Sequence, residues 1–160
     1  MKPIDFYTDT VCNNDISSFD SGYSVFNDYL HYRDDSSVIH YILDSESENL
    51  IAYFSLLSSA LLYGELSHLG AIPAIELKMF ALDKRYQGRG ISTLLIDSVI
   101  ETITHYSAEY VGAKIILLYS VPIDSILNFY EESGFRRTNG LFATYKSPFN
   151  EGCIPMFKLL

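Results

Sequence analysis

Residues 83–90, DKRYQGRG, decide how the rest of this sequence is interpreted. Two glycines, Gly88 and Gly90, flank Arg89, and long apolar runs lie on both sides of the segment. Glycine adopts backbone conformations that other residues avoid, so the segment predicts a sharp connection. The periodicity of the neighbouring residues indicates which secondary-structure elements this segment connects.

The segment before this connection, residues 71–82, alternates like a strand that buries one face throughout and the other only towards its end. The first face consists of Ile75, Leu77, Met79 and Ala81, and the second of Glu76, Lys78, Phe80 and Leu82. Residues 91–110 place apolar side chains at helical spacing, and residues 113–121 form the continuous apolar run of a central strand. Together these segments predict a right-handed parallel strand–helix–strand unit.

The remaining segments predict further strands and helices around this unit. Residues 38–43 and 50–64 are rich in strand-forming side chains and flank a polar turn, which indicates a hairpin. A helix is expected within 17–37, a short helix ending at Gly134, and two short strands at the end of the chain. The predicted fold class is α/β, of the α+β type with a mixed sheet, in a single domain over residues 1–160.

Two nucleotide-binding motifs do not fit the glycine pair. A Walker loop needs GxxxxGK followed by Ser or Thr, and the sequence contains no such run. A dinucleotide fingerprint needs a third glycine where Thr93 stands, and an acidic residue at the end of the next strand, whereas Glu109 precedes that strand. An ordinary strand–helix turn and an anion-binding loop both remain open.

The position of the loop favours an anion as its ligand. Glycine amides at the start of a long helix, together with the positive end of the helix dipole, form an anion-binding site, and Arg89 adds a cation. A pyrophosphate that keeps its adenosine at the surface would suit such a loop.

With these residues identified, the sequence resembles the GNAT superfamily of N-acetyltransferases. FALDKRYQGRGISTLLI at 80–96 is similar to the family's motif A, whose loop reads Q/R-x-x-G-x-G/A. ILNFYEESGF at 126–135 is similar to the second signature, in which a tyrosine, here Tyr130, stands four residues before a Gly-Phe pair. The resemblance covers about residues 17–160.

This resemblance implies a GNAT-like acyl-CoA N-acyltransferase fold with acetyl-CoA as co-substrate. The two parallel strands would splay apart at their carboxyl ends, and the pantetheine arm would enter between them. The residues expected to bind acetyl-CoA are Phe80, Ala81 and Leu82 on the strand, and Gln87, Gly88, Arg89, Gly90, Ile91 and Ser92 in the loop and first helical turn. Relatives often carry an asparagine where Ile123 stands, so one cofactor contact differs here.

The resemblance also implies catalytic roles for Tyr130 and Glu76 in direct acetyl transfer to a primary amine. Tyr130 would protonate the departing thiolate, and Glu76 resembles the glutamate that some GNAT enzymes use as a base through water. A main-chain N–H of Leu82 would stabilise the oxyanion. From the residues alone, three alternatives remain: Tyr130 as a core aromatic, Glu76 as a partly exposed strand carboxylate, and His68 as the base.

The net charge of −9 is concentrated in one part of the chain. Residues 1–65 hold eleven acidic and two basic residues, whereas residues 66–160 hold nine of each. An acidic excess disfavours nucleic acid as a partner, because nucleic-acid affinity rests largely on phosphate neutralisation. It suits either a solvated face or a patch that attracts a cationic amine.

The acceptor therefore has competing interpretations. FDSGYSVFNDYL, IPAIELKMFALDKRYQGRG and CIPMFKLL resemble a GNAT subgroup of toxins from toxin–antitoxin operons, which acetylate aminoacyl-tRNA. Charge instead favours a small-molecule, peptide or protein amine and disfavours tRNA. A non-catalytic acetyl-CoA-binding module is the third hypothesis, and the retained Tyr130 and glycine pair argue against it.

Cysteine and histidine spacing indicates the compartment and the absence of a metal. Cys12 and Cys153 lack CxxC or Cys/His spacing, so no disulfide scaffold and no metal site are expected. No apolar run is long enough for a membrane helix, and no signal peptide is evident. The sequence predicts a cytoplasmic enzyme without a membrane partner, as a monomer or homodimer.

Overall fold

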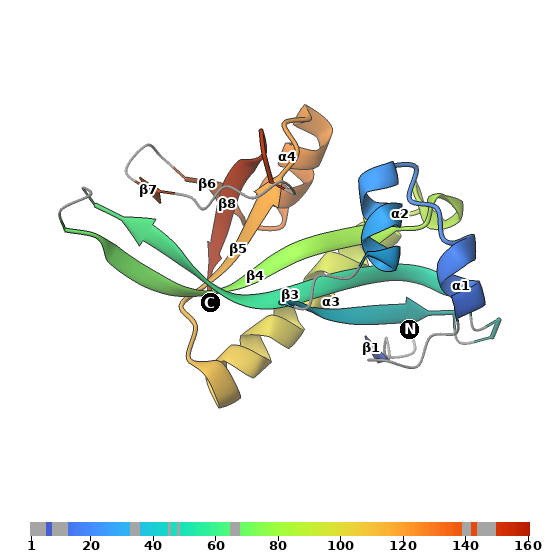
Figure 1. The fold of residues 1–160 in the computed structure, drawn as a ribbon, viewed down its shortest axis with the longest axis horizontal. Coiled ribbons are helices and arrows are strands. Elements are labelled where there is room, and N and C mark those ends of the chain that lie inside the picture. The colour runs from blue at the N-terminus through green and yellow to red at the C-terminus, as the bar shows by residue number, and fades with distance from the viewer. Residues whose placement is uncertain are drawn as a thin grey trace. The chain divides into compact units, whose positions relative to one another are not determined.

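A computed structural model describes residues 6–7, 13–32, 36–44, 46–47, 49–64, 68–138, 142–143 and 150–160. The chain divides into two compact units. The first unit comprises Met1–Leu57 and Leu77–Leu94, and the second comprises Ser58–Glu76 and Leu95–Leu160. Three elements that Figure 1 labels contribute residues to both units: β3 (Leu50–Tyr63), β4 (Gly70–Leu82) and α3 (Ile91–Tyr106).

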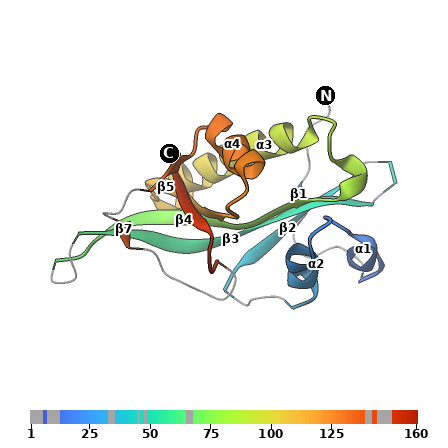
Figure 2. The ribbon, with the colours of Figure 1, turned by 90° about the horizontal axis from the view of Figure 1, so that it is seen from above.

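The first unit is built on four strands in the order β1-β2-β3-β4. β1 (Phe6–Tyr7) and β2 (Val38–Leu43) pair antiparallel, and β2 pairs antiparallel with β3, which confirms the predicted hairpin. Two helices, α1 (Asn13–Ser18) and α2 (Ser24–His31), lie on one side of these strands (Figure 2). The core between helices and strands consists of Ile16, Phe19, Tyr29, Leu30, Ile39, Tyr41, Leu50, Tyr53, Met79 and Ala81.

The second unit continues the sheet in the order β3-β4-β5-β8-β6. β5 (Ile115–Ser120) pairs parallel with β4, and β8 (Ile154–Leu159) pairs antiparallel with both β5 and β6 (Arg136–Arg137). β7 (Phe142–Ala143) pairs with the end of β3. Figure 2 shows α3 and α4 (Asp124–Glu132) on the same side of these strands.

The burial of β4 and β5 confirms the face predictions. Ile75, Leu77, Met79 and Ala81 are buried, whereas Glu76, Lys78 and Phe80 are half-buried and Leu82 is buried. β5 is buried at every position except Tyr119, as expected for a central strand. The parallel pairing of β4 with β5 confirms the predicted strand–helix–strand unit and the mixed sheet.

Two local features differ from the sequence expectations. α1 was not expected, because NNDISS is short and mostly polar; its Ile16 is buried in the core of the first unit. α3 ends at Tyr106 and continues as a π turn over Ser107–Val111, which Gly112 closes at a φ of 68°.

No helix among the described residues is both long and apolar enough to span a bilayer.

Candidate active site

The glycine-rich loop follows η1 (Lys84–Tyr86), a 3-10 turn after β4, and leads into α3. Gly88 and Gly90 have φ values of 72° and 74°, in the left-handed region that favours glycine. No described residue accepts a hydrogen bond from the main-chain N–H groups of residues 88–92. Five successive N–H donors are therefore without a partner among the described residues, at the start of a 16-residue helix.

This loop has the features of a phosphate cradle. Residues 88–90 are exposed, and the Arg89 side chain forms no ion pair with any described residue. Unpaired amides and the helix dipole both favour an anion at this position. A Cβ built at Gly88 or Gly90 meets no protein atom within 4 Å, so it is the backbone conformation that favours glycine at these two positions.

One of the predicted phosphate donors is already used within the protein. The N–H of Gln87 donates to the carbonyl oxygen of Lys84 at 3.3 Å, and the Gln87 side chain is hydrogen-bonded as well. The amides of Gly88, Arg89, Gly90, Ile91 and Ser92 remain as donors. The run of N–H groups without a partner among the described residues thus begins at Gly88, one residue after the first predicted donor.

The parallel pairing of β4 and β5 is short. It joins Ala74–Glu76 to Ile115–Leu117 and does not continue, although β4 extends to Leu82 and β5 to Ser120. Asp83 donates its N–H to Ile51 on β3 at 2.8 Å. Because successive N–H groups of a strand point in opposite directions, the N–H of Leu82 is directed away from β3 and that of Ala81 towards it.

Tyr130 lies on α4 of the second unit, where its ring packs edge-on against two phenylalanines. The ring centroids of Phe129 and Phe135 lie 5.1 and 5.8 Å from that of Tyr130. Burial raises the pKa of the Tyr130 phenol, so the hydroxyl keeps its proton at neutral pH. No described residue hydrogen-bonds to this hydroxyl, which leaves its proton available to a ligand.

Glu76 lies on β4 opposite Leu117, on the face that also carries Tyr119. The Glu76 side chain is half-buried. Burial and, to a smaller extent, the negative charge of Glu76 raise the pKa of Tyr119 to about 12. A carboxylate and a protonated phenol therefore lie near each other on this face, and Tyr119 is a polar group that its apolar sequence context concealed.

The sequence also drew attention to His68, Ile123 and the two cysteines. His68 is exposed in a connecting segment, and no group of metal-binding side chains occurs among the described residues. Ile123 is exposed and directly precedes α4. Because its side chain is isoleucine, it has no amide group with which to contact a cofactor. Cys153 is a free thiol, and Cys12 lies outside the described residues.

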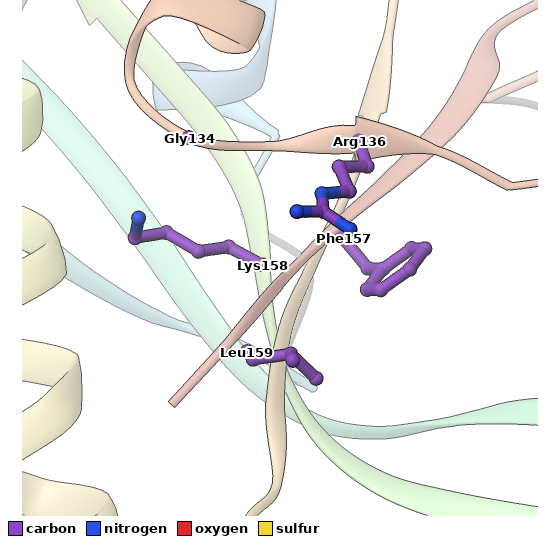
Figure 3. Close-up of a pocket in the computed structure, with 5 residues that line it drawn as sticks. All are labelled: Gly134, Arg136, Phe157, Lys158 and Leu159. Carbon is purple, nitrogen blue, oxygen red and sulfur yellow. The ribbon is translucent and has the colours of Figure 1, made fainter.

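A small surface pocket lies within the second unit. Figure 3 shows its lining, which comes from β6, β8 and the turn after α4: Gly134, Arg136, Phe157, Lys158 and Leu159. The ammonium group of Lys158 lies against Gly134, near the carboxyl end of α4, where a cation is stabilised by the helix dipole. The pocket contains none of the residues predicted to act in the reaction.

A family model described as an acetyltransferase (GNAT) domain matches residues 18–149. No protein of curated function matches the sequence.

Several solved structures share the fold. A Tyr-to-Phe mutant of the AtaT toxin, bound to the C-terminus of the antitoxin AtaR and acetyl-CoA, is 20% identical with a TM-score of 0.73, over 98% of this chain and 92% of that chain. AtaT complexed with acetyl-methionyl-tRNAfMet is 17% identical with a TM-score of 0.71, over 98% and 95%. The KacTA–DNA complex is 18% identical with a TM-score of 0.71, over 98% and 93%. At these identities the likeness concerns the fold.

Proposed function

Since this chain belongs to the GNAT family of acetyltransferases, we propose that it transfers an acetyl group from acetyl-CoA directly to a primary amine. It acts as a single domain over residues 1–160, and its lone cysteines suit a cytoplasmic enzyme. The observation that carries this proposal is the run of five unpaired amides at residues 88–92, with two left-handed glycines at the start of α3.

The loop would hold the pyrophosphate of acetyl-CoA through these amides. Arg89 would add a solvent-screened charge, and the outward N–H of Leu82 would donate to the ligand at the end of β4. When bound, acetyl-CoA supplies a thioester whose carbonyl carbon bonds to the amine nitrogen as the carbon–sulfur bond breaks.

Two side chains would move the protons of this reaction. The amine nitrogen loses one proton, and Glu76 is the proposed base that accepts it through water. The sulfur leaves with the bonding electron pair, and the hydroxyl of Tyr130 is the proposed acid that protonates it. The Tyr130 hydroxyl has no hydrogen-bond partner among the described residues, which supports this assignment because its proton can be directed to the sulfur.

The charge of the chain favours a small-molecule, peptide or protein amine as acceptor. The acidic excess over residues 1–65 attracts an ammonium group and repels phosphate. Aminoacyl-tRNA is the second candidate, favoured by the fold shared with AtaT, whose complex with acetyl-methionyl-tRNAfMet is known. The nine basic residues after residue 65 would have to supply its phosphate contacts.

An acceptor comparison separates the two candidates. Release of free thiol from acetyl-CoA should be measured with polyamines, lysine peptides and charged tRNA, at low and at high salt. An amine acceptor predicts turnover with the first two substrates. Turnover confined to charged tRNA, and lost steeply as salt rises, would identify the second candidate instead.

Acetyl-CoA should stabilise the folded chain. A ligand at about 100 times its dissociation constant adds about 2.7 kcal/mol to the free energy of unfolding. For a domain of this size, that corresponds to a rise in melting temperature of roughly 5–10 °C. Thermal unfolding with and without acetyl-CoA measures this rise. An unchanged melting temperature at millimolar acetyl-CoA would exclude acetyl-CoA as the co-substrate.

A further inference from the structure

Residues 83–92, which we call the phosphate loop, are hydrogen-bonded to the turn that precedes α2, although the two segments lie far apart in sequence. We call residues 20–23 the α2 turn. Asp20 donates its N–H to the carboxylate of Asp83 at 3.0 Å, across 63 residues. Lys84 donates its N–H to the carbonyl oxygen of Asp20 at 2.8 Å, and the Lys84 ammonium pairs with the Asp20 carboxylate. All these residues belong to the first unit.

Asp83 is the buried anchor on the loop side. Its side chain is 1% exposed and accepts from the N–H of Arg85 at 2.9 Å, from Arg85 Nε at 2.8 Å and from Arg85 Nη2 at 2.9 Å, in addition to Asp20. Burial opposes its ionisation, but these hydrogen bonds outweigh burial and hold the pKa of Asp83 below its usual value. An ionised carboxylate with four donors fixes η1 to the α2 turn.

Gln87 provides the link closest to the phosphate cradle. Its amide Nε2 donates to the carbonyl oxygen of Ser21 at 3.0 Å and to that of Leu82 at 2.8 Å. Both hydrogens of the amide are therefore used, one towards the α2 turn and one towards the end of β4. Since Gln87 directly precedes Gly88, the start of the cradle is held by the carbonyl of a residue 66 positions away.

Asn27, in the middle of α2, shapes the α2 turn from the other side. Its Oδ1 accepts from the N–H and the hydroxyl of Ser21, both at 2.9 Å, and its Nδ2 donates to the Asp20 carboxylate at 3.1 Å. Asn27 makes no hydrogen bond to residues 83–92 within the described part of the chain. The carbonyls that hold Lys84 and Gln87 thus depend on a residue that does not touch the loop.

We propose that Asp83 and Gln87 are positioning residues that couple the phosphate loop to the α2 turn, so that a pyrophosphate in the loop and a docked α2 stabilise each other. A loop fixed by its ligand keeps Gln87 and Lys84 in place for the turn, and an ordered turn keeps the loop amides in place for the ligand. By thermodynamic reciprocity, each partner changes the equilibrium of the other by the same factor. This inference rests on the proposed function, which supplies the pyrophosphate.

A substitution at Asn27 tests the coupling from the side that the ligand does not touch. Asn27→Ala should weaken the binding of coenzyme A, measured by calorimetry, between about fivefold and about a hundredfold, the usual range of coupling between sites. Asn49→Ala is the matched control: Asn49 also donates its side-chain amide, to Ser47 at 2.8 Å, in an exposed turn of the first unit. Its affinity should stay within about twofold of wild type.

Three outcomes of this comparison are informative. A loss with Asn27→Ala alone supports the coupling. Unchanged affinity in Asn27→Ala would overturn it, and so would an equal loss in both variants, because that would indicate general destabilisation.

Hydrogen exchange supplies a readout that needs no substitution at Asn27. Saturating coenzyme A should slow exchange at residues 88–92 and also along α2 in the wild-type chain. In Gln87→Glu, which removes the donor to Ser21, residues 88–92 should still be protected at saturation while α2 loses its additional protection. Gln87→Arg restores N–H donors of sufficient reach and should therefore restore the additional protection of α2.

Absence of the coupling and absence of coenzyme A binding give different experimental results. Protection of the loop without any protection of α2 in the wild type would overturn the coupling and leave the proposed function intact. Equal protection of α2 in wild type and Gln87→Glu would also overturn it. No binding of coenzyme A by the wild-type chain would remove the proposed function, and the coupling with it.

Discussion

Tyr130→Phe should lower the turnover number by about 10²- to 10⁴-fold while leaving acetyl-CoA affinity nearly unchanged. The ring packs edge-on between Phe129 and Phe135, and phenylalanine preserves that packing. The hydroxyl has no hydrogen-bond partner among the described residues, so its removal leaves no protein group unpaired. The loss should therefore fall on the chemical step, as for an interaction made mainly in the transition state.

Steady-state kinetics and calorimetry on the same preparations separate the two quantities. Tyr110→Phe is the matched control, because Tyr110 is 72% exposed in the π turn that follows α3 and has no proposed role. It should turn over like wild type. If Tyr130→Phe retains turnover within about threefold of wild type, with chemistry shown to be rate-limiting, Tyr130 is only a packing residue.

Gly90→Val should weaken acetyl-CoA binding by at least about tenfold, and far more than Arg89→Ala does. Gly90 has a φ of 74°, which a β-branched residue adopts only with strain, so the loop would shift its amides away from the ligand. Arg89 is exposed, and a solvent-screened charge of this kind contributes about 1 kcal/mol or less, equivalent to about fivefold or less in affinity.

Gly152→Val provides the control for backbone strain. Gly152 has a φ of 75°, and a Cβ there also meets no atom within 4 Å, but it lies in a turn of the second unit. Its substitution should reduce the melting temperature without changing acetyl-CoA affinity. An effect of Arg89→Ala larger than that of Gly90→Val, measured by calorimetry, would show that the arginine side chain anchors the ligand.

Local patterns predicted much of the fold from the sequence. The alternation over residues 71–82 gave the buried face of β4 correctly, because strand periodicity reports directly on burial. The glycine pair located the loop correctly, since positive φ at Gly88 and Gly90 is a local requirement. The expected splay agrees with pairing that ends at Glu76 and Leu117.

Local sequence patterns could not predict the tertiary contacts. NNDISS carries a weak helical signal, and α1 forms with Ile16 buried in the core. The bond from Gln87 to Ser21 spans 66 residues, so nothing in the local sequence assigns that side chain to the protein instead of the ligand. Likewise, the proximity of Tyr119 to Glu76 follows from the register of β4 with β5, which periodicity does not determine.

The most direct test of the central claim is a stoichiometric assay of acetyl transfer. Purified protein should be incubated with acetyl-CoA and an amine acceptor while free thiol and acetylated amine are quantified by mass spectrometry over the same time course. Direct transfer predicts that the two products appear one to one, only when the amine is present, without acetylated protein as an intermediate. Protein that binds acetyl-CoA but acetylates none of the small amines, peptides or charged tRNA would contradict the assignment of this chain as an active acetyltransferase.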